Sequence, residues 1–76
     1  MNQVSVGTWV KVTGFTPGEE EVFSIVPEGR GNILENEIPA GSPLARVLHG
    51  AEPGDRVKFS PPAGEVELTV LEVGKL

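Results

Sequence analysis

The chain has 76 residues, a net charge of −5 at pH 7 and no cysteine; this length makes a single domain, and the missing cysteines exclude a disulfide framework or a thiolate metal site. No apolar run approaches the roughly 20 residues that a membrane span needs, so we expect a cytoplasmic domain without membrane contact. Six Lys and Arg are scattered among eleven Asp and Glu, which argues against direct nucleic-acid binding, because such binding depends on a basic patch. The acidic surface either favours a basic protein partner or serves solubility alone.

The first part of the chain alternates in the manner of a β-hairpin. One face of the first predicted strand carries β-branched side chains: Val6, Thr8, Val10 and Val12. The other face carries Trp9, Lys11 and Thr13. Thr16-Pro17-Gly18 predicts a reversal, because proline presets φ at one central turn position and glycine accepts a positive φ at the next. A second strand follows, in which the side chains alternate over Glu21–Ile25.

The middle of the chain predicts a loop followed by a third strand. Glycine and charged residues dominate Pro27–Asn32, a composition typical of a flexible loop. Ile33–Ile38 predicts an irregular strand. Pro39 ends it, because proline cannot donate a hydrogen bond to a neighbouring strand.

The segment Ser42–Gly50 predicts a short helix. Ser42 is a favoured N-cap, because its hydroxyl can accept an otherwise unpaired backbone N–H of the first turn. Pro43 suits the first helical position, and Gly50 suits a left-handed cap at the other end. The apolar side chains form one stripe at spacings of i, i+3 and i+4: Leu44, Val47 and Leu48.

Two more strands follow the turn Glu52–Asp55. The first alternates over Arg56–Phe59 and is broken by Pro61–Gly64. The second has one apolar face, formed by Val66, Leu68 and Val70. Its alternation is lost over Leu71–Val73, which indicates either a bulge or a stretch covered on both faces. Together the elements predict an α+β fold, an antiparallel sheet of four to six strands with one short helix across one face.

Catalysis needs a nucleophile, a base and a group that orients the base, and no residues show that arrangement. His49 is better explained by capping the last helical carbonyls than by catalysis, and Ser42 as an N-cap than as a nucleophile. Successive strand residues point to opposite faces, so Glu19–Glu21 fits a solvated hairpin shoulder better than a Mg²⁺ or Ca²⁺ site. Gly29–Gly31 is too short for a phosphate loop. We therefore expect no enzyme activity, metal, cofactor or small-molecule ligand.

Two features fit a binding function instead. The start of the predicted helix places Arg46 outward beside Ser42, Pro43 and Leu44. It is either a contact surface or a capped helix that only packs. Trp9, on the face away from the helix, is either an interface anchor, since tryptophan is enriched in binding hot spots, or a cover for the outer face of the sheet. The second interpretation of Trp9 is favoured.

Several segments together resemble the C-terminal domain of the bacterial transcript cleavage factors GreA and GreB. The helix start Ser42-Pro43-Leu44-Ala45-Arg46 fits the Ser-Pro-(Leu/Ile/Met)-(Gly/Ala)-Arg pattern of that family. The other matching segments keep the family's order and spacing: Val6–Val10, Glu19–Val26, Pro53–Val57, Pro62–Glu67 and Val70–Val73. Each motif is weak alone, and together they are fairly specific. The resemblance covers residues 1–76 as a single domain, without the N-terminal coiled coil of the family.

The resemblance implies an FKBP-like fold and a docking role on bacterial RNA polymerase. Gre factors bind at the mouth of the polymerase secondary channel through this domain, while the acidic tip of their coiled coil helps the polymerase to cleave its own transcript. The contacts that the resemblance implies are Gly41, Ser42, Pro43 and the neighbouring Leu44 and Arg46. This chain departs from the family at Gly41, where Asn or Asp is usual, so a polar side chain is missing from the expected contact.

Other interpretations stay open beside this one. The domain is either excised from a longer factor or a short stand-alone relative that competes for the channel mouth. A regulator of nucleoside-diphosphate kinase shares the domain, although its helix start usually departs from the Ser-Pro-Leu-Ala-Arg pattern. An FKBP-like prolyl isomerase shares the fold, although such enzymes line a pocket with several aromatic residues, including tyrosine, and this chain has no tyrosine.

Overall fold

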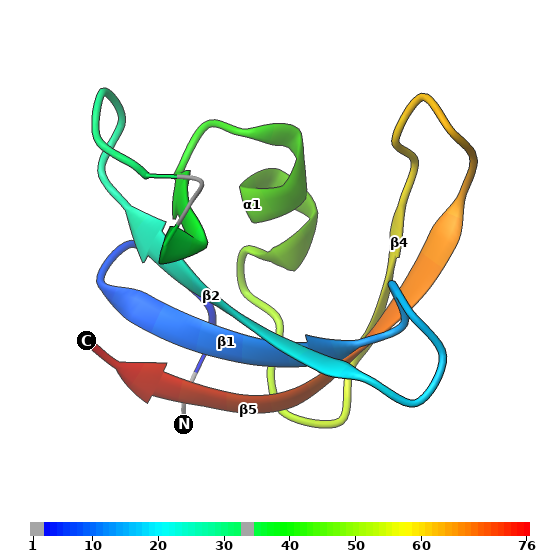
Figure 1. Ribbon diagram of the computed structural model, residues 1–76. Coiled ribbons are helices and arrows are strands. Elements are labelled where there is room, and N and C mark those ends of the chain that lie inside the picture. Colours follow the sequence, from blue (N-terminus) through cyan, green and yellow to red (C-terminus); the bar gives the residue numbers. More distant parts are fainter. Residues whose placement is uncertain (1–2, 33–34) are drawn as a thin grey trace.

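The computed structural model of the protein describes residues 3–32 and 35–76. These residues form one curled sheet with a short helix lying in its concave side (Figure 1). The elements in chain order are β1 (Thr8–Thr13), β2 (Glu20–Val26), β3 (Glu37–Pro39), α1 (Pro43–Leu48), β4 (Arg56–Phe59) and β5 (Val66–Lys75). The strand order in the sheet is β3-β2-β1-β5-β4. The predicted α+β class, the number of strands and the single short helix are therefore confirmed.

The predicted hairpin of β1 and β2 is confirmed. The two strands pair antiparallel, and the turn closes with the Glu19 N–H donating to the Thr16 carbonyl oxygen at 3.1 Å. Gly18 has a φ of +80°, the conformation for which glycine was expected there. The prediction that Val6 belongs to the first strand, on the same face as Val10 and Val12, is wrong. Val6 lies in a turn with Gly7, whose φ is +89°, and its side chain is 48% exposed because β1 begins only at Thr8.

The last strand, β5, pairs antiparallel with both β1 and β4 and lies inside the sheet. Its register against β1 shifts between Lys11 and Val12, which pair with Glu72 and Val70. Leu71 is therefore an extra residue at a bulge. This bulge is the physical reason that the alternation in the sequence is lost at this point.

The third strand differs from the prediction in extent and direction. β3 covers only Glu37–Pro39 and pairs parallel with β2, so the sheet is mixed and not wholly antiparallel. Of the predicted strand Ile33–Ile38, residues 33–34 lie outside the described residues, and Asn36 lies in a turn with a φ of 56°. The direction is parallel because the connection from β2 carries the chain back along that strand before β3 begins. Pro39 is the last residue of β3, so the strand ends one residue beyond the predicted end at Ile38.

The helix α1 has the predicted N-terminal cap. The Ser42 hydroxyl accepts a hydrogen bond from the Ala45 N–H at 3.3 Å, and Pro43 is the first helical residue. Gly50 has the predicted left-handed conformation, with a φ of +83°. Its N–H, however, donates to the Val4 carbonyl oxygen at 2.8 Å instead of to the helix. Gly50 therefore joins the end of α1 to the N-terminal segment of the chain.

The core lies between α1 and the concave side of the sheet. Its buried members come from the N-terminal segment, β1, β2, α1, the residues just after α1, and β5: Val4, Val10, Val12, Ile25, Ala45, Leu48, Ala51, Val70 and Val73. Three phenylalanines extend it toward the β4 end as a chain of edge-to-face contacts, because the ring of Phe15 lies 5.9 Å from Phe23 and 6.2 Å from Phe59. Within residues 3–32 and 35–76, no helix has the length and apolar character that a membrane crossing requires.

Candidate protein-docking site

The start of α1 is the part of the helix that faces solvent. Pro43 and Arg46 are exposed, whereas Ala45 and Leu48 on the opposite side of the helix are fully buried against the sheet. The predicted apolar stripe is only partly buried, because Leu44 and Val47 are half-buried. Ala45 takes a core position that its small size did not indicate. Burial on one side fixes the helix, and the other side is free to meet a partner.

The residues predicted from the sequence as a docking site come together at this end of α1. Gly41, Ser42, Pro43, Leu44 and Arg46 are all at least partly accessible and lie within one turn and the first part of the helix. The Ser42 N–H donates to the Pro39 carbonyl oxygen at 3.0 Å, which joins the helix start to the end of β3. We call this group, Gly41 to Leu44 with Arg46, the helix start.

Backbone hydrogen bonds hold the approach to the helix start against the sheet. The Ala40 N–H donates to the Val26 carbonyl oxygen at 2.9 Å, at the end of β2. The N-cap bond from Ala45 to Ser42 then fixes the first turn of the helix. A surface held at both sides in this way loses little conformational freedom on binding, which lowers the entropic cost of association.

Glu28 is a residue of this site that the sequence patterns did not indicate. It lies in the loop between β2 and β3, and its carboxylate oxygen Oε2 accepts a hydrogen bond from the Gly41 N–H at 2.7 Å. The two residues are 13 positions apart. No local pattern joins them, because the contact depends on how the connection between β2 and β3 returns along the sheet.

The residues weighed for catalysis do not come together. Ser42 lies at one end of α1 and His49 at the other, where His49 is exposed and its backbone N–H donates to the Ala45 carbonyl oxygen at 2.9 Å. The cap predicted for the His49 imidazole is therefore made by the backbone. Among the described residues no three His, Cys, Asp or Glu side chains gather as a metal site.

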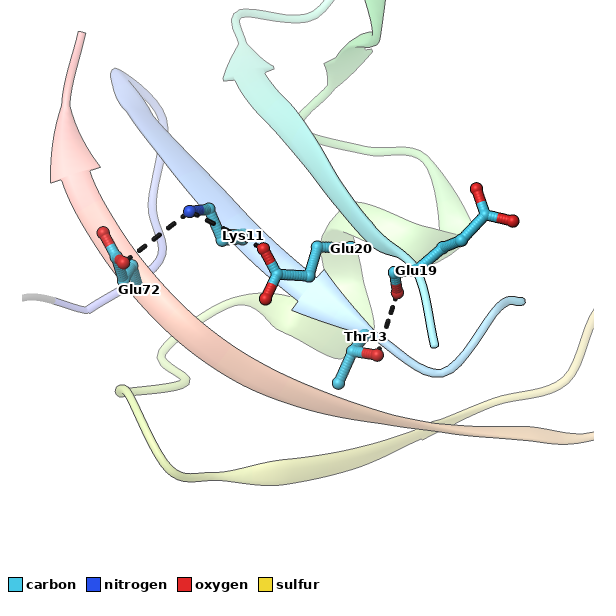
Figure 2. A network of polar contacts seen from close by, with 5 residues as sticks. All are labelled: Lys11, Thr13, Glu19, Glu20 and Glu72. Carbon is cyan, nitrogen blue, oxygen red and sulfur yellow. Dashed lines mark hydrogen bonds and ion pairs between the residues drawn. The ribbon is translucent and has the colours of Figure 1, made fainter. Parts of the chain in front are cut away.

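The acidic run Glu19–Glu21, at the start of β2, is divided between the two faces of the sheet. Glu20 lies on the outer face, where its carboxylate is 3.8 Å from the Lys11 ammonium nitrogen, and Glu72 approaches the same nitrogen at 3.7 Å (Figure 2). Glu21 pairs with Val12, whose side chain is in the core, and so faces the concave side. Glu19 contributes its carbonyl oxygen, which accepts a hydrogen bond from the Thr13 hydroxyl at 2.9 Å.

Trp9 lies on the outer face of the sheet, away from α1. It pairs with Gly74 of β5, and a Cβ atom added to Gly74 would meet the indole ring at 2.5 Å. The indole therefore occupies the space above the glycine, and Trp9 is half-buried as a result. This contact agrees with the favoured interpretation, in which Trp9 covers the outer face of a small sheet.

Comparisons with known proteins all find transcription factors of the GreA/GreB type. Residues 1–75 match the family described as transcription elongation factor, GreA/GreB, C-terminal. The transcription elongation factor GreA of Shouchella clausii is 38% identical over 72 residues, which cover 95% of this chain and 46% of that protein. The transcription factor Gfh1 has a solved structure that superposes with a TM-score of 0.86 at 24% identity, over 96% of this chain and 48% of that one.

A second solved structure agrees on the fold. The elongation factor GreA/GreB from Nitrosomonas europaea superposes with a TM-score of 0.78 at 20% identity, over 95% of this chain and 60% of that one. The chain spans about half the length of the curated relatives that it matches. The similarity therefore concerns one part of those proteins, and it includes the helix start described above.

Proposed function

The chain belongs to the family of GreA/GreB transcription elongation factor C-terminal domains, and from that premise we propose that it docks on bacterial RNA polymerase at the rim of the secondary channel. The helix start is the docking surface. The observation that carries this proposal is the exposure of Pro43 and Arg46 on a helix whose other side is fixed in the core. Such an arrangement offers a partner a rigid, shaped surface.

The residues of the helix start have distinct parts in the proposed contact. Pro43 offers a rigid apolar ring, which loses no side-chain freedom on binding. Arg46 offers a planar guanidinium that can donate several hydrogen bonds to a carboxylate or carbonyl of the partner. Ser42 acts indirectly, because its hydroxyl already caps the helix and fixes where Pro43 lies. Leu44 is half-buried and packs against the core, which helps to hold the helix in place.

The charge of the chain supports a protein partner over a nucleic acid. The net charge of −5 would repel a phosphate backbone, whereas it would favour approach to a basic region of a protein. We therefore propose that the chain touches the polymerase and not the transcript. In this proposal the chain has no enzyme activity, promotes no cleavage by itself and binds no cofactor or small molecule, so that docking alone makes it a competitor for the channel mouth.

Competition for core RNA polymerase tests the proposal. A labelled intact Gre factor is bound to bacterial core polymerase and titrated with the 76-residue chain, with the double variant Pro43→Ala/Arg46→Glu, and with Arg56→Glu as the matched control. Arg56 is exposed on β4 and pairs with Thr69 on the outer face of the sheet, so its variant makes the same charge change outside the helix start. Thermal unfolding of each variant verifies that the fold is retained.

We expect the parent and Arg56→Glu to displace the Gre factor at similar concentrations. The double variant is expected to need at least about tenfold more protein, since a loss of 1.4 kcal/mol changes the affinity tenfold. Equal displacement by a folded double variant would move the docking surface away from the helix start. Failure of the parent to displace the Gre factor at about 100 times a micromolar Kd would contradict docking by this chain.

A further inference from the structure

The carboxylate of Glu28 lies directly over Gly41 of the helix start. Its Oε2 atom accepts the hydrogen bond from the Gly41 N–H at 2.7 Å. A Cβ atom built on Gly41 would lie 2.7 Å from Oε2, and 2.9 Å from both Oε1 and Cδ of the same carboxylate. The Glu28 carboxylate thus fills the space that a side chain at position 41 would otherwise enter.

The backbone at position 41 does not itself require glycine. Eight other glycines of the described chain have a positive φ, for example Gly50 at +83°, and Gly41 is not among them. A residue with a side chain can therefore adopt the conformation found at position 41. What excludes a side chain is the end of a flexible glutamate, which moves aside at little cost. With glycine at position 41, the polar group at this place belongs to Glu28.

We propose that Glu28 supplies the polar side chain that position 41 lacks, and that its carboxylate is a specificity-determining contact for a basic side chain of the polymerase. This inference rests on the docking function proposed above. A carboxylate has about four sites for accepting hydrogen bonds, and the Gly41 N–H occupies one. Oε1 has no partner among residues 3–32 and 35–76. Glu28 is exposed, so this oxygen is accessible to an arginine or lysine of the partner.

The position of Glu28 suits it to recognition more than to stability. A hydrogen bond at an exposed site contributes little to folding, because water competes for both groups. In a docked complex the same carboxylate would be shielded from water beside Gly41, and a charge-assisted hydrogen bond to a basic side chain would then be strong. Removal of Glu28 should therefore weaken docking while leaving the unfolding of the free chain nearly unchanged.

Four variants separate this inference from a general effect of charge. Polymerase affinity is measured by the same competition for the parent, Glu28→Ala, Gly41→Asp and the double variant Glu28→Ala/Gly41→Asp. Glu65→Ala is the matched control, because Glu65 is exposed in the turn between β4 and β5, on the other side of the molecule from the β2–β3 loop (Figure 1). Thermal unfolding is recorded for each.

We expect Glu28→Ala to bind about tenfold more weakly, Glu65→Ala to bind like the parent, and the double variant to return to within about threefold of the parent. The double variant does so because the Gly41→Asp carboxylate occupies the space that Glu28 leaves. Parent-like binding by Glu28→Ala, or an equal loss in Glu65→Ala, would overturn the inference while leaving the docking function intact. A Glu28→Ala loss that Gly41→Asp fails to restore would overturn it as well. Absence of binding by the parent would contradict the docking function and this inference with it.

Discussion

At the scale of single residues, Gly14 and Gly64 distinguish backbone strain from steric contact. Both have nearly the same left-handed φ, +132° and +135°. A Cβ atom at Gly14 would collide with the backbone of Glu67 and Leu68, whereas one at Gly64 would meet nothing within 4 Å. The backbone strain imposed on an alanine is therefore comparable at the two positions, but only an alanine at position 14 would also collide with neighbouring backbone.

We expect Gly64→Ala to lower the free energy of unfolding by about 1 kcal/mol, the cost of an unfavourable φ. Gly14→Ala is expected to lower it by about 1–3 kcal/mol more, because a backbone segment of β5 must move to admit the methyl group. Urea unfolding of both variants and the parent at one pH measures the difference. Equal losses at the two positions would show that Gly14 is retained for its φ alone.

The Glu28–Gly41 contact shows where inference from single residues ends. The sequence indicated that a polar side chain was missing at position 41, since the family usually has Asn or Asp there. It gave no sign that Glu28 reaches the same place, because the loop between β2 and β3 has no pattern that fixes its path. A long-range contact between two irregular segments can be found only in the folded chain.

At the scale of elements, α1 is too short to be stable alone. Isolated helices are marginal in water below about 12 residues, and α1 covers only Pro43–Leu48. Its stability comes from the burial of Ala45 and Leu48 and from the cap at Ser42. The cap therefore matters both for folding and for the shape of the proposed docking surface.

Replacement of the cap gives a direct measure of that dependence. We expect Ser42→Ala to lower the free energy of unfolding by about 1 kcal/mol, because the Ala45 N–H loses its acceptor. Ser60→Ala, in the exposed connection after β4, is the matched control and should stay within about 0.5 kcal/mol of the parent. Denaturant midpoints of the two variants make the comparison. If both variants matched the parent, the cap would contribute nothing to the stability of α1.

The elements that could be predicted are those whose signals are local. The cap, proline and apolar stripe of α1 are contained within one segment, and the hairpin of β1 and β2 needs only alternation and a turn. β3 was predicted too long and in the wrong direction, since three residues carry no usable alternation. Val6 was predicted in the first strand because alternation alone cannot show that Val6 and Gly7 form a turn before β1.

At the scale of the whole molecule, the buried core is distinct from the exposed surface that is proposed for docking. The sheet and the buried side of α1 form a core that needs only apolar side chains of suitable size. Pro43 and Arg46 of the helix start are exposed, and so is Glu28. The solved relatives share this fold at identities of 24% and 20%.

The docking proposal is tested most directly by a cryo-electron microscopy structure of the 76-residue chain bound to bacterial core RNA polymerase. We predict that the chain lies at the rim of the secondary channel, with Pro43 and Arg46 against the polymerase and the Glu28 carboxylate beside a basic side chain. The outer face of the sheet, with Trp9 and Lys11, is predicted to face solvent. A complex in which that outer face meets the polymerase, or in which the chain binds away from the channel rim, would contradict the proposed docking surface.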